Sequence, residues 1–319
     1  GLITFEDLEN YKAVERPPIE GTYKDFRIVS MPPASSGGVH LIQMLNMLEE
    51  YPINEMGFGS ADSIHILAEV MKRAYADRSK HLGDMDFYDV PFSLMSKKYS
   101  RSLNKSISVK ARTASKDVFP GDPYPYESPD TTHFSVMDQF GNAVSNTYTL
   151  NFSYGSGIMI PGTGMLMNNE MDDFSSKPGV PNGYGLLGSE ANSIQPNKRP
   201  LSSMTPTIIF KDDKPYLVLG SPGGSRIITT VLQVALNVME HKMNVAQAVN
   251  SPRIHHQWLP EVLMMEKGFG PDTEKILKEK GYNLYPSSTM GSVQAIIKEG
   301  EYFYGAADPR RPGSGAVAP

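Results

Sequence analysis

The octapeptide Pro-Asp-Thr-Thr-His-Phe-Ser-Val, residues 129–136, marks the place where a proline-rich connector passes into a strand-like pattern. Upstream of it, the run Pro-Gly-Asp-Pro-Tyr-Pro-Tyr at 120–126 favours an extended, exposed loop, because proline fixes φ and lacks a backbone N–H. Downstream, apolar and polar residues alternate over 134–137, which is typical of a strand. The loop 138–142 and the run 143–150 then predict a second strand, and hence a β-hairpin.

Thr131 stands at the first position of this strand, directly after the loop. A threonine hydroxyl is a weak nucleophile and needs an adjacent base. A free α-amino group titrates at about 7.7–8.0, so near neutral pH part of it can accept the hydroxyl proton. Cleavage of the Asp130–Thr131 bond would therefore give Thr131 both roles. The competing interpretation is that Thr131 and Thr132 are β-branched residues that open an ordinary strand.

The composition excludes several classes of protein. The chain has 319 residues, 39% of them hydrophobic and 20% charged, with a net charge of −5, which is typical of a soluble globular protein of one or two domains. It has no run of Lys and Arg that would indicate nucleic acid or an anionic membrane, and no apolar run of the ~18–20 residues that span a bilayer. The absence of cysteine excludes disulfides and cysteine nucleophiles. The first residues, without Met or a signal-like segment, predict a processed or truncated start.

Upstream of the hairpin the sequence predicts mostly helices. We expect helices over 2–13, 39–51 and from Ser60 onward, a short strand at 26–31, and a connector over 104–130. Thr4 and Ser60 are the predicted N-caps, and the serine and glycines at 36–38 are expected to cap the helix that follows them. The charged residues of the long helix are expected to face solvent; they are Lys72, Arg73, Asp77, Arg78 and Lys80.

Downstream, the glycine-rich turn 220–225 lies between a predicted strand and a predicted helix over 226–240. A phosphate-binding loop would need a lysine at a fixed spacing, which is missing here. The turn therefore offers backbone N–H groups that suit an oxyanion. His255 and His256, next to Trp258, point to opposite faces of an extended segment, so packing is the better interpretation than a metal site. Hairpins flanked by amphipathic helices predict an α-β-β-α sandwich.

Several stretches taken together resemble the γ-glutamyltransferase family of N-terminal nucleophile hydrolases. They are residues 131–133, 141–144, 147–151, 168–174, 198–206 and 220–226, with 36–38 and 75–78 upstream. The resemblance covers nearly the whole chain and implies an α+β fold, the four-layer α-β-β-α sandwich of these hydrolases. It divides the chain into residues 1–130, the C-terminal part of a large subunit, and residues 131–319, a small catalytic subunit that begins at the nucleophile.

The resemblance also implies catalytic roles. Thr131 matches the nucleophile that attacks a γ-carbonyl, and Thr149 matches the residue whose hydroxyl orients it. Gly223 and Gly224 match an oxyanion hole, in which each N–H donor would stabilise the tetrahedral intermediate by about 3–4 kcal/mol. The bond between Asp130 and Thr131 is the implied self-cleavage site.

The remaining matches concern a glutamyl head group. Its α-ammonium would be held by Asn151, Glu170 and Asp173, with Asn151 also near the carboxylate, and its α-carboxylate by Ser202 and Ser203. A zwitterion needs acidic groups for its amine and donors for its carboxylate, and such contacts position the γ-carbonyl. The competing interpretations are a loop turn at 172–173 and capping at 202–203. Tyr184 resembles the aromatic tip of a lid.

The function implied is that of a self-cleaving γ-glutamyltranspeptidase and hydrolase, made as a zymogen, that acts on glutathione or similar γ-glutamyl compounds. Water, an amino acid or a peptide amine would resolve the acyl-enzyme. Both subunits would come from one precursor, without metal or cofactor, in a periplasmic or extracellular location. The arginine that binds the α-carboxylate in this family is expected upstream of Gly1.

Three alternatives remain open. A related acylase would prefer a dicarboxylic side chain such as glutaryl, although the acidic residues and the serine pair favour an α-amino acid head. A relative that processes poly-γ-glutamate is the second. A non-catalytic binding protein that keeps the fold and does not mature is the third, and its intact mass would show one uncut chain.

Overall fold

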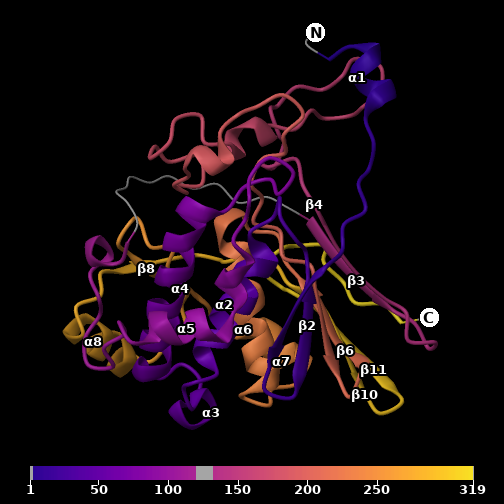
Figure 1. Ribbon diagram of the computed structural model, residues 1–319. Helices are drawn as coiled ribbons and strands as arrows, with labels where there is room; N and C mark the ends of the chain where they lie inside the picture. The colour runs from indigo at the N-terminus through magenta and orange to yellow at the C-terminus, as the bar shows by residue number, and fades with distance from the viewer. Residues whose placement is uncertain (1–2, 120–131, 319) are drawn as a thin grey trace.

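The computed structural model describes residues 3–119 and 132–318, and its centre is a six-stranded antiparallel sheet (Figure 1). In spatial order the strands are β1 (Ile19–Tyr23), β2 (Phe26–Ser30), β5 (Thr207–Lys211), β6 (Lys214–Gly220), β10 (Gln294–Glu299) and β11 (Tyr302–Ala307). Two of these strands precede residue 130 and four follow residue 131. The two predicted subunits therefore share one sheet.

A layer of helices covers one face of this sheet (Figure 1). Its main members are α2 (Gly37–Leu48), α4 (Ala61–His81), α5 (Lys97–Asn104) and α6 (Ile227–Met239). Every residue of α2 and α6 is buried, as expected for mostly apolar helices packed within the core. The sheet contributes alternate residues to this core, among them Ile209, Leu217 and Leu219.

The hairpin of β3 (Thr132–Met137) and β4 (Ala143–Tyr148) packs on the other face, against β6 and β10. The predicted hairpin is confirmed. His133 points inward beneath Gly220, where a Cβ would lie 2.3 Å from the imidazole, so only glycine fits there. Phe134, 44% exposed, faces outward from the hairpin.

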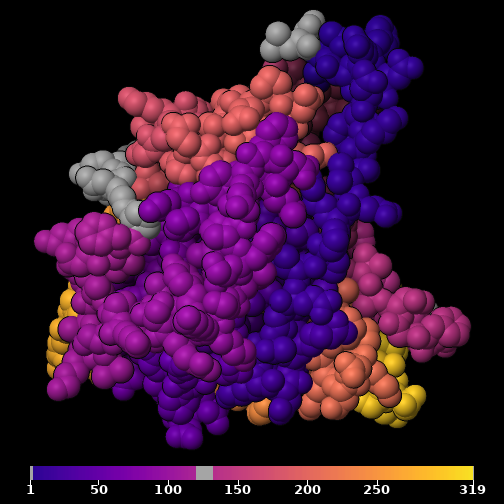
Figure 2. Space-filling model, viewed as in Figure 1, coloured from indigo at the N-terminus to yellow at the C-terminus, as the bar shows by residue number. Residues whose placement is uncertain are grey.

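Shorter elements complete the fold. They are α1 (Phe5–Asn10), α3 (Ile53–Met56), α7 (Val245–Asn250), α8 (Pro271–Glu279), β7 (Ile254–His255), β8 (Leu263–Met265), β9 (Leu284–Pro286) and 3-10 turns at Phe92–Met95, Ser115–Asp117, Glu170–Asp173, Glu190–Asn192 and Gly224–Arg226. Figure 2 shows α1 at the top of the molecule, and none of its residues is buried. Within the described ranges, no helix has the length and apolarity needed to cross a membrane.

The N-caps were predicted with mixed success. Thr4 accepts from the N–H of Asp7 in a capping box, and Ser60 accepts from the N–H of Ser63, so both predictions are confirmed. The prediction for Ser36 was wrong. Its hydroxyl makes no capping bond to α2 and donates instead to the carbonyl of Ser202, at 2.8 Å.

The prediction that the charged face of α4 lies in solvent was also wrong. Lys72, Arg73, Asp77 and Arg78 are buried, and only Lys80 is exposed. Lys72 and Arg73 can be buried because the Glu69 carboxylate pairs with both of them, at 2.7 Å each. The hydrogen-bonded polar side therefore packs against other parts of the chain.

The connector is described only as far as residue 119, so its later part and the Asp130–Thr131 bond lie outside the described residues. The part that is described does not form a free loop. The backbone N–H of Thr113 donates to Glu69 at 3.0 Å, and the indole N–H of Trp258 donates to the carbonyls of Ser115 and Val118 at 2.9 Å. Side chains from both sides of residue 130 thus hold this segment.

Candidate active site

The site begins at the turn that joins β6 to α6. Gly223 has φ of 139° and Gly224 has φ of 53°, which are conformations that residues with a Cβ rarely adopt. Space also requires glycine, because a Cβ on Gly224 would lie 2.3 Å from the ring of Tyr184. The turn brings backbone N–H groups to the start of a helix, where the helix dipole favours negative charge.

A small cavity lies against this turn. It has a volume of about 20 Å³ and is lined by Thr149, Asn151, Asp173, Tyr184, Ser202, Ser203, Met204, Gly224 and Ile227. Seven of the predicted site residues are therefore brought together from five separate stretches of chain. Gly223 directly precedes Gly224, and Glu170 belongs to the same 3-10 turn as Asp173. Thr131 and Asp130 lie outside the described residues.

Thr149 and Asn151 form one wall just beyond the end of β4. The N–H of Asn151 donates to the hydroxyl oxygen of Thr149 at 2.8 Å, and Asn151 itself has φ of 73°. This left-handed conformation reverses the chain locally, and asparagine tolerates it better than most residues. The Asn151 amide also donates to the carbonyl of Asn169, at 3.1 Å. The amide is thereby tied to the segment that leads to Glu170.

Tyr184 forms the roof of the cavity. It is only 5% exposed, its hydroxyl donates to the carbonyl of Asn151 at 2.8 Å, and its ring meets Phe152 edge-on. A cavity of about 20 Å³ holds a single water molecule, so it is closed to larger ligands as it stands. Displacement of the Tyr184 ring would open it, which is compatible with the expected role of a lid.

Asp173 borders the cavity, and the Glu170 carboxyl lies near it in the same 3-10 turn. The pKa of Asp173 is raised to about 8, mainly by burial and also by the neighbouring Glu170, while Arg78 opposes the shift. Burial alone raises the pKa of Glu170 to about 7. Both groups therefore lack enough positive charge nearby to stabilise their ionised forms, and a bound ammonium would supply it.

Asp172 has a different role from Asp173. Its carboxylate accepts the N–H of Gly183 at 2.8 Å and so braces the loop that carries Tyr184. Asp173 lines the cavity, where its Oδ1 has only a long contact, 3.4 Å, with the amide of Asn182. Both residues belong to the 3-10 turn, so the turn interpretation holds for both, and Asp173 in addition borders the cavity.

Ser202 and Ser203 also border the cavity. The backbone of Ser202 pairs with the start of α2, since its N–H donates to Ala34 and its carbonyl accepts from Ser36, both at 2.9 Å. The Ser202 hydroxyl accepts the N–H of Met204 at 3.0 Å. No helix follows the pair, so the capping interpretation fails.

Sequence reasoning missed Arg78 as a neighbour of this site. Its guanidinium, from the middle of the core, donates to the Ser203 hydroxyl at 3.1 Å. The residues around Arg78 could have indicated that it is buried. Ala74, Tyr75 and Ala76 place small or apolar residues on several sides of α4. Such a helix has no broad solvated face.

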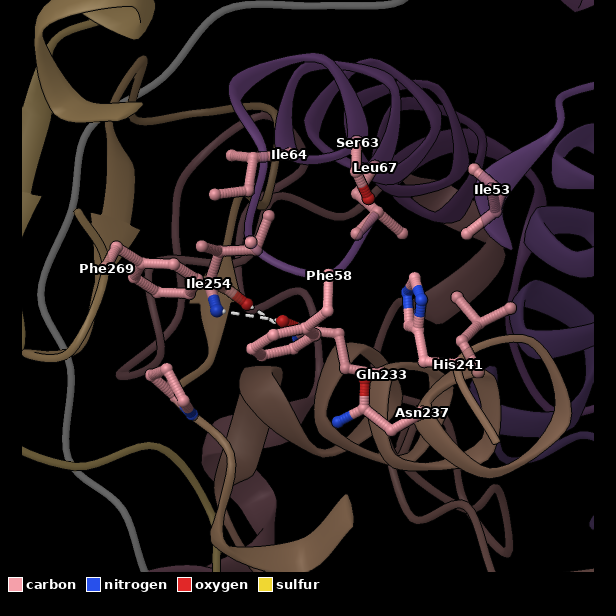
Figure 3. A pocket seen from close by; sticks show the side chains of 13 residues that line it. Ile53, Phe58, Ser63, Ile64, Leu67, Gln233, Asn237, His241, Ile254 and Phe269 are labelled. Carbon is pink, nitrogen blue, oxygen red and sulfur yellow. Dashed lines mark hydrogen bonds between the residues drawn. The ribbon is translucent and has the colours of Figure 1, made fainter. Parts of the chain in front are cut away.

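Another cavity, between α4 and α6, has no comparable chemistry (Figure 3). It also measures about 20 Å³ and is lined mostly by apolar side chains such as Ile64, Leu67 and Phe269. Its Gln233 is fully engaged with the backbone of Ile254, through bonds of 2.8 and 2.9 Å. We regard it as a packing gap.

The two adjacent histidines are packing residues, as predicted. The imidazole of His255 bonds the Thr229 hydroxyl at 2.8 Å and the Gln257 amide at 3.0 Å. His256 accepts the N–H of Trp258 at 3.1 Å. Across residues 3–119 and 132–318, no three His, Asp or Glu side chains are grouped so as to hold a metal ion.

Comparison with known proteins agrees with this site. The family described as Gamma-glutamyltranspeptidase matches residues 1–318. The glutathione hydrolase proenzyme of Escherichia coli strain K12 is 56% identical over 313 residues, which cover 97% of this chain and 54% of that protein. The chain thus spans about half the length of the curated relatives it matches.

Solved structures support the same conclusion. A T380A mutant of the Helicobacter pylori gamma-glutamyltranspeptidase is 57% identical with a TM-score of 0.55, over 56% of this chain and 100% of that one. A cephalosporin acylase from Bacillus halodurans is 25% identical with a TM-score of 0.81, over 97% of this chain and 54% of the other. These neighbours confirm the α+β, N-terminal nucleophile hydrolase fold. The chain belongs to the gamma-glutamyltranspeptidase family.

Proposed function

We propose that this chain carries the catalytic centre of a self-cleaving γ-glutamyltranspeptidase and glutathione hydrolase. The observation that carries the proposal is the polarity of the cavity. Asp173, with the Glu170 carboxyl near it, borders the same cavity as Gly224 and the serine pair, whose Ser203 is bonded to Arg78, and both carboxyl groups have raised pKa values. This pattern is complementary to an α-amino acid head whose side chain ends in a carbonyl.

The proposed reaction starts with Thr131, freed by cleavage of the Asp130–Thr131 bond. Its hydroxyl attacks the γ-carbonyl carbon while its own α-amine takes the hydroxyl proton. The carbonyl oxygen becomes an oxyanion, which the N–H groups of Gly223 and Gly224 stabilise. The tetrahedral intermediate collapses, the departing amine takes the proton, and a γ-glutamyl ester on Thr131 remains. Water or an acceptor amine then attacks this ester by the same steps in reverse, and Thr131 regains its proton.

Three parts of the proposal do not follow from membership of the family alone. The acceptors are amino acids and peptides, the two subunits come from one precursor, and the location is periplasmic or extracellular. The solved Helicobacter pylori chain is matched over its whole length by 56% of this chain. The proposed small subunit, residues 131–319, has 189 of the 319 residues and is therefore of similar length, which supports the two-subunit proposal.

An acylase that takes a glutaryl group is the alternative, and the resemblance to a cephalosporin acylase supports it. A glutaryl group has no α-ammonium, so Glu170 and Asp173 would remain next to one another without a cation. Their raised pKa values therefore favour the γ-glutamyl substrate.

The test uses the complete precursor, expressed with everything upstream of Gly1. We expect its smaller product to begin Thr-Thr-His-Phe by N-terminal sequencing, and the matured enzyme to hydrolyse a γ-glutamyl anilide far faster than the glutaryl anilide. The Thr131→Ala precursor is the matched control, which should stay intact and inactive. A precursor that never splits would favour a non-catalytic binding protein, and a preference for the glutaryl anilide would favour the acylase.

A further inference from the structure

Arg78 is a buried cation bonded to Ser203, one of the two serines that border the cavity. The residue is 4% exposed, and its Nε donates to the Ser36 hydroxyl at 2.9 Å. Its Nη2 donates to the Ser203 hydroxyl at 3.1 Å and to the carbonyl of Leu201 at 3.3 Å. All three acceptors are neutral. Arg78 is therefore anchored to the loop that carries the serine pair.

The charge of Arg78 has no close counter-ion within the described part of the chain, where none of the ion pairs includes it. Its neighbours on α4 differ, because Lys72 and Arg73 share the Glu69 carboxylate. Asp173, which borders the cavity, acts on the pKa of Arg78 through its electric field. A buried positive charge without a partner is unfavourable, and an anion bound in the cavity would offset it.

The bond to Arg78 also decides what the Ser203 hydroxyl can do. A guanidinium has only donors, so the Ser203 oxygen must be the acceptor in that bond. The hydroxyl proton of Ser203 is then directed elsewhere, and Ser203 borders the cavity. A nearby positive charge also makes the hydroxyl a stronger donor. The Ser203 hydroxyl is therefore well suited to donate a hydrogen bond to a negatively charged group in the cavity.

We propose that Arg78 is a positioning residue that holds Ser203 as a hydrogen-bond donor for the carboxylate of the ligand. It also supplies a positive field beside the serine pair. The role is additional to the upstream arginine that the family resemblance implies. This inference rests on the proposed function, because it takes the ligand to be an α-amino acid head group.

The experiment is a double-mutant cycle on the full-length matured enzyme, with a γ-glutamyl anilide as substrate. We expect Arg78→Met to raise KM about tenfold in the wild-type background and less than twofold in a Ser203→Ala background, with kcat changed less than threefold. Arg78→Lys, which keeps the cation, should recover most of the KM. Lys80→Met is the matched control, since it removes an exposed cation from the same helix and should leave KM unchanged.

Equal effects of Arg78→Met in both backgrounds would overturn the inference, because a purely structural role does not depend on the Ser203 hydroxyl. If Arg78→Met does not fold, the same cycle is run with Arg78→Lys, whose residual effect on KM must also vanish in Ser203→Ala. A wild-type enzyme that neither matures nor cleaves the anilide would refute the proposed function. A functional wild type with an additive cycle would refute only the role of Arg78.

Discussion

Replacing Asp173 by asparagine should stabilise the folded protein near neutral pH while it weakens substrate binding. The pKa of Asp173 is raised from its usual 3.8 to about 8. A carboxyl group whose pKa is raised by folding is most favourable to the fold below its unfolded pKa, and that stability is lost as the pH rises through the folded pKa. Asparagine has nearly the same shape and does not ionise. The variant should therefore gain stability relative to wild type between about pH 4 and pH 8.

The size of the gain follows from the shift. Each pKa unit corresponds to about 1.4 kcal/mol, so the full shift would give several kcal/mol. Asp173 is partly exposed and coupled to Glu170, so we expect a gain of about 1–2 kcal/mol, or roughly 2–5 °C in Tm, at pH 7.5.

The assay is Tm against pH for both proteins, with the KM of a γ-glutamyl anilide measured on the same samples. We expect the gain in Tm to disappear toward pH 4 and the KM at pH 7.5 to rise about tenfold or more, since a charge-assisted contact with the α-ammonium is lost. Asp212→Asn, at an exposed turn, is the control and should change neither. A Tm difference that is the same at pH 4.5 and pH 7.5 would show that the carboxylate is not destabilised by burial, and an unchanged KM would remove Asp173 from the ligands.

Three further predictions concern the reacting groups. Thr131→Ala should abolish both self-cleavage, read on a gel, and anilide release, whereas Thr131→Ser should keep some of each; full activity of the alanine variant would end the assignment of Thr131 as the nucleophile. Thr149→Ala should still mature but lower kcat on the order of 100-fold at similar KM, because an orienting hydroxyl is lost; an unchanged kcat would contradict that role. Gly224→Ala should lower kcat at least tenfold, because its Cβ would collide with the Tyr184 ring and strain a φ of 53°. Kinetics of the Gly224→Ala/Tyr184→Ala double variant separate the two causes, since recovery there implicates the collision alone.

Much of the fold and of the site could be predicted where local patterns and spatial neighbours agree. The hairpin of β3 and β4 follows from simple alternation, and the Gly223–Gly224 turn follows from glycines between an apolar strand and a helix. The ordered motifs placed Thr149, Asn151 and Ser203 at one cavity, although these residues are far apart along the chain. Resemblance, rather than periodicity, supplied that grouping.

The rest depends on contacts that no local pattern contains. The charged side of α4 was predicted to face solvent because charged residues are usually exposed. In the structure, Glu69 pairs with Lys72 and Arg73. Arg78 donates to the hydroxyl groups of Ser36 and Ser203, which are distant in the sequence. The contacts of the connector up to residue 119 were likewise absent from any local pattern. Thr113 donates its N–H to Glu69, and the carbonyls of Ser115 and Val118 accept from Trp258.

The shared sheet has a consequence for the fate of the two products of cleavage. β2 and β5 are joined by antiparallel pairing from Phe26 with Lys211 to Ser30 with Thr207, and a cut after Asp130 leaves this ladder intact. Pulling the pieces apart would turn both strands into bare edges, which readily pair with other chains and aggregate. The nicked protein should thus unfold as a single cooperative unit, and its separated halves should be difficult to reassemble. If the proposed cleavage takes place, the two pieces would stay together through this ladder, and the matured protein would last as long as they separate slowly.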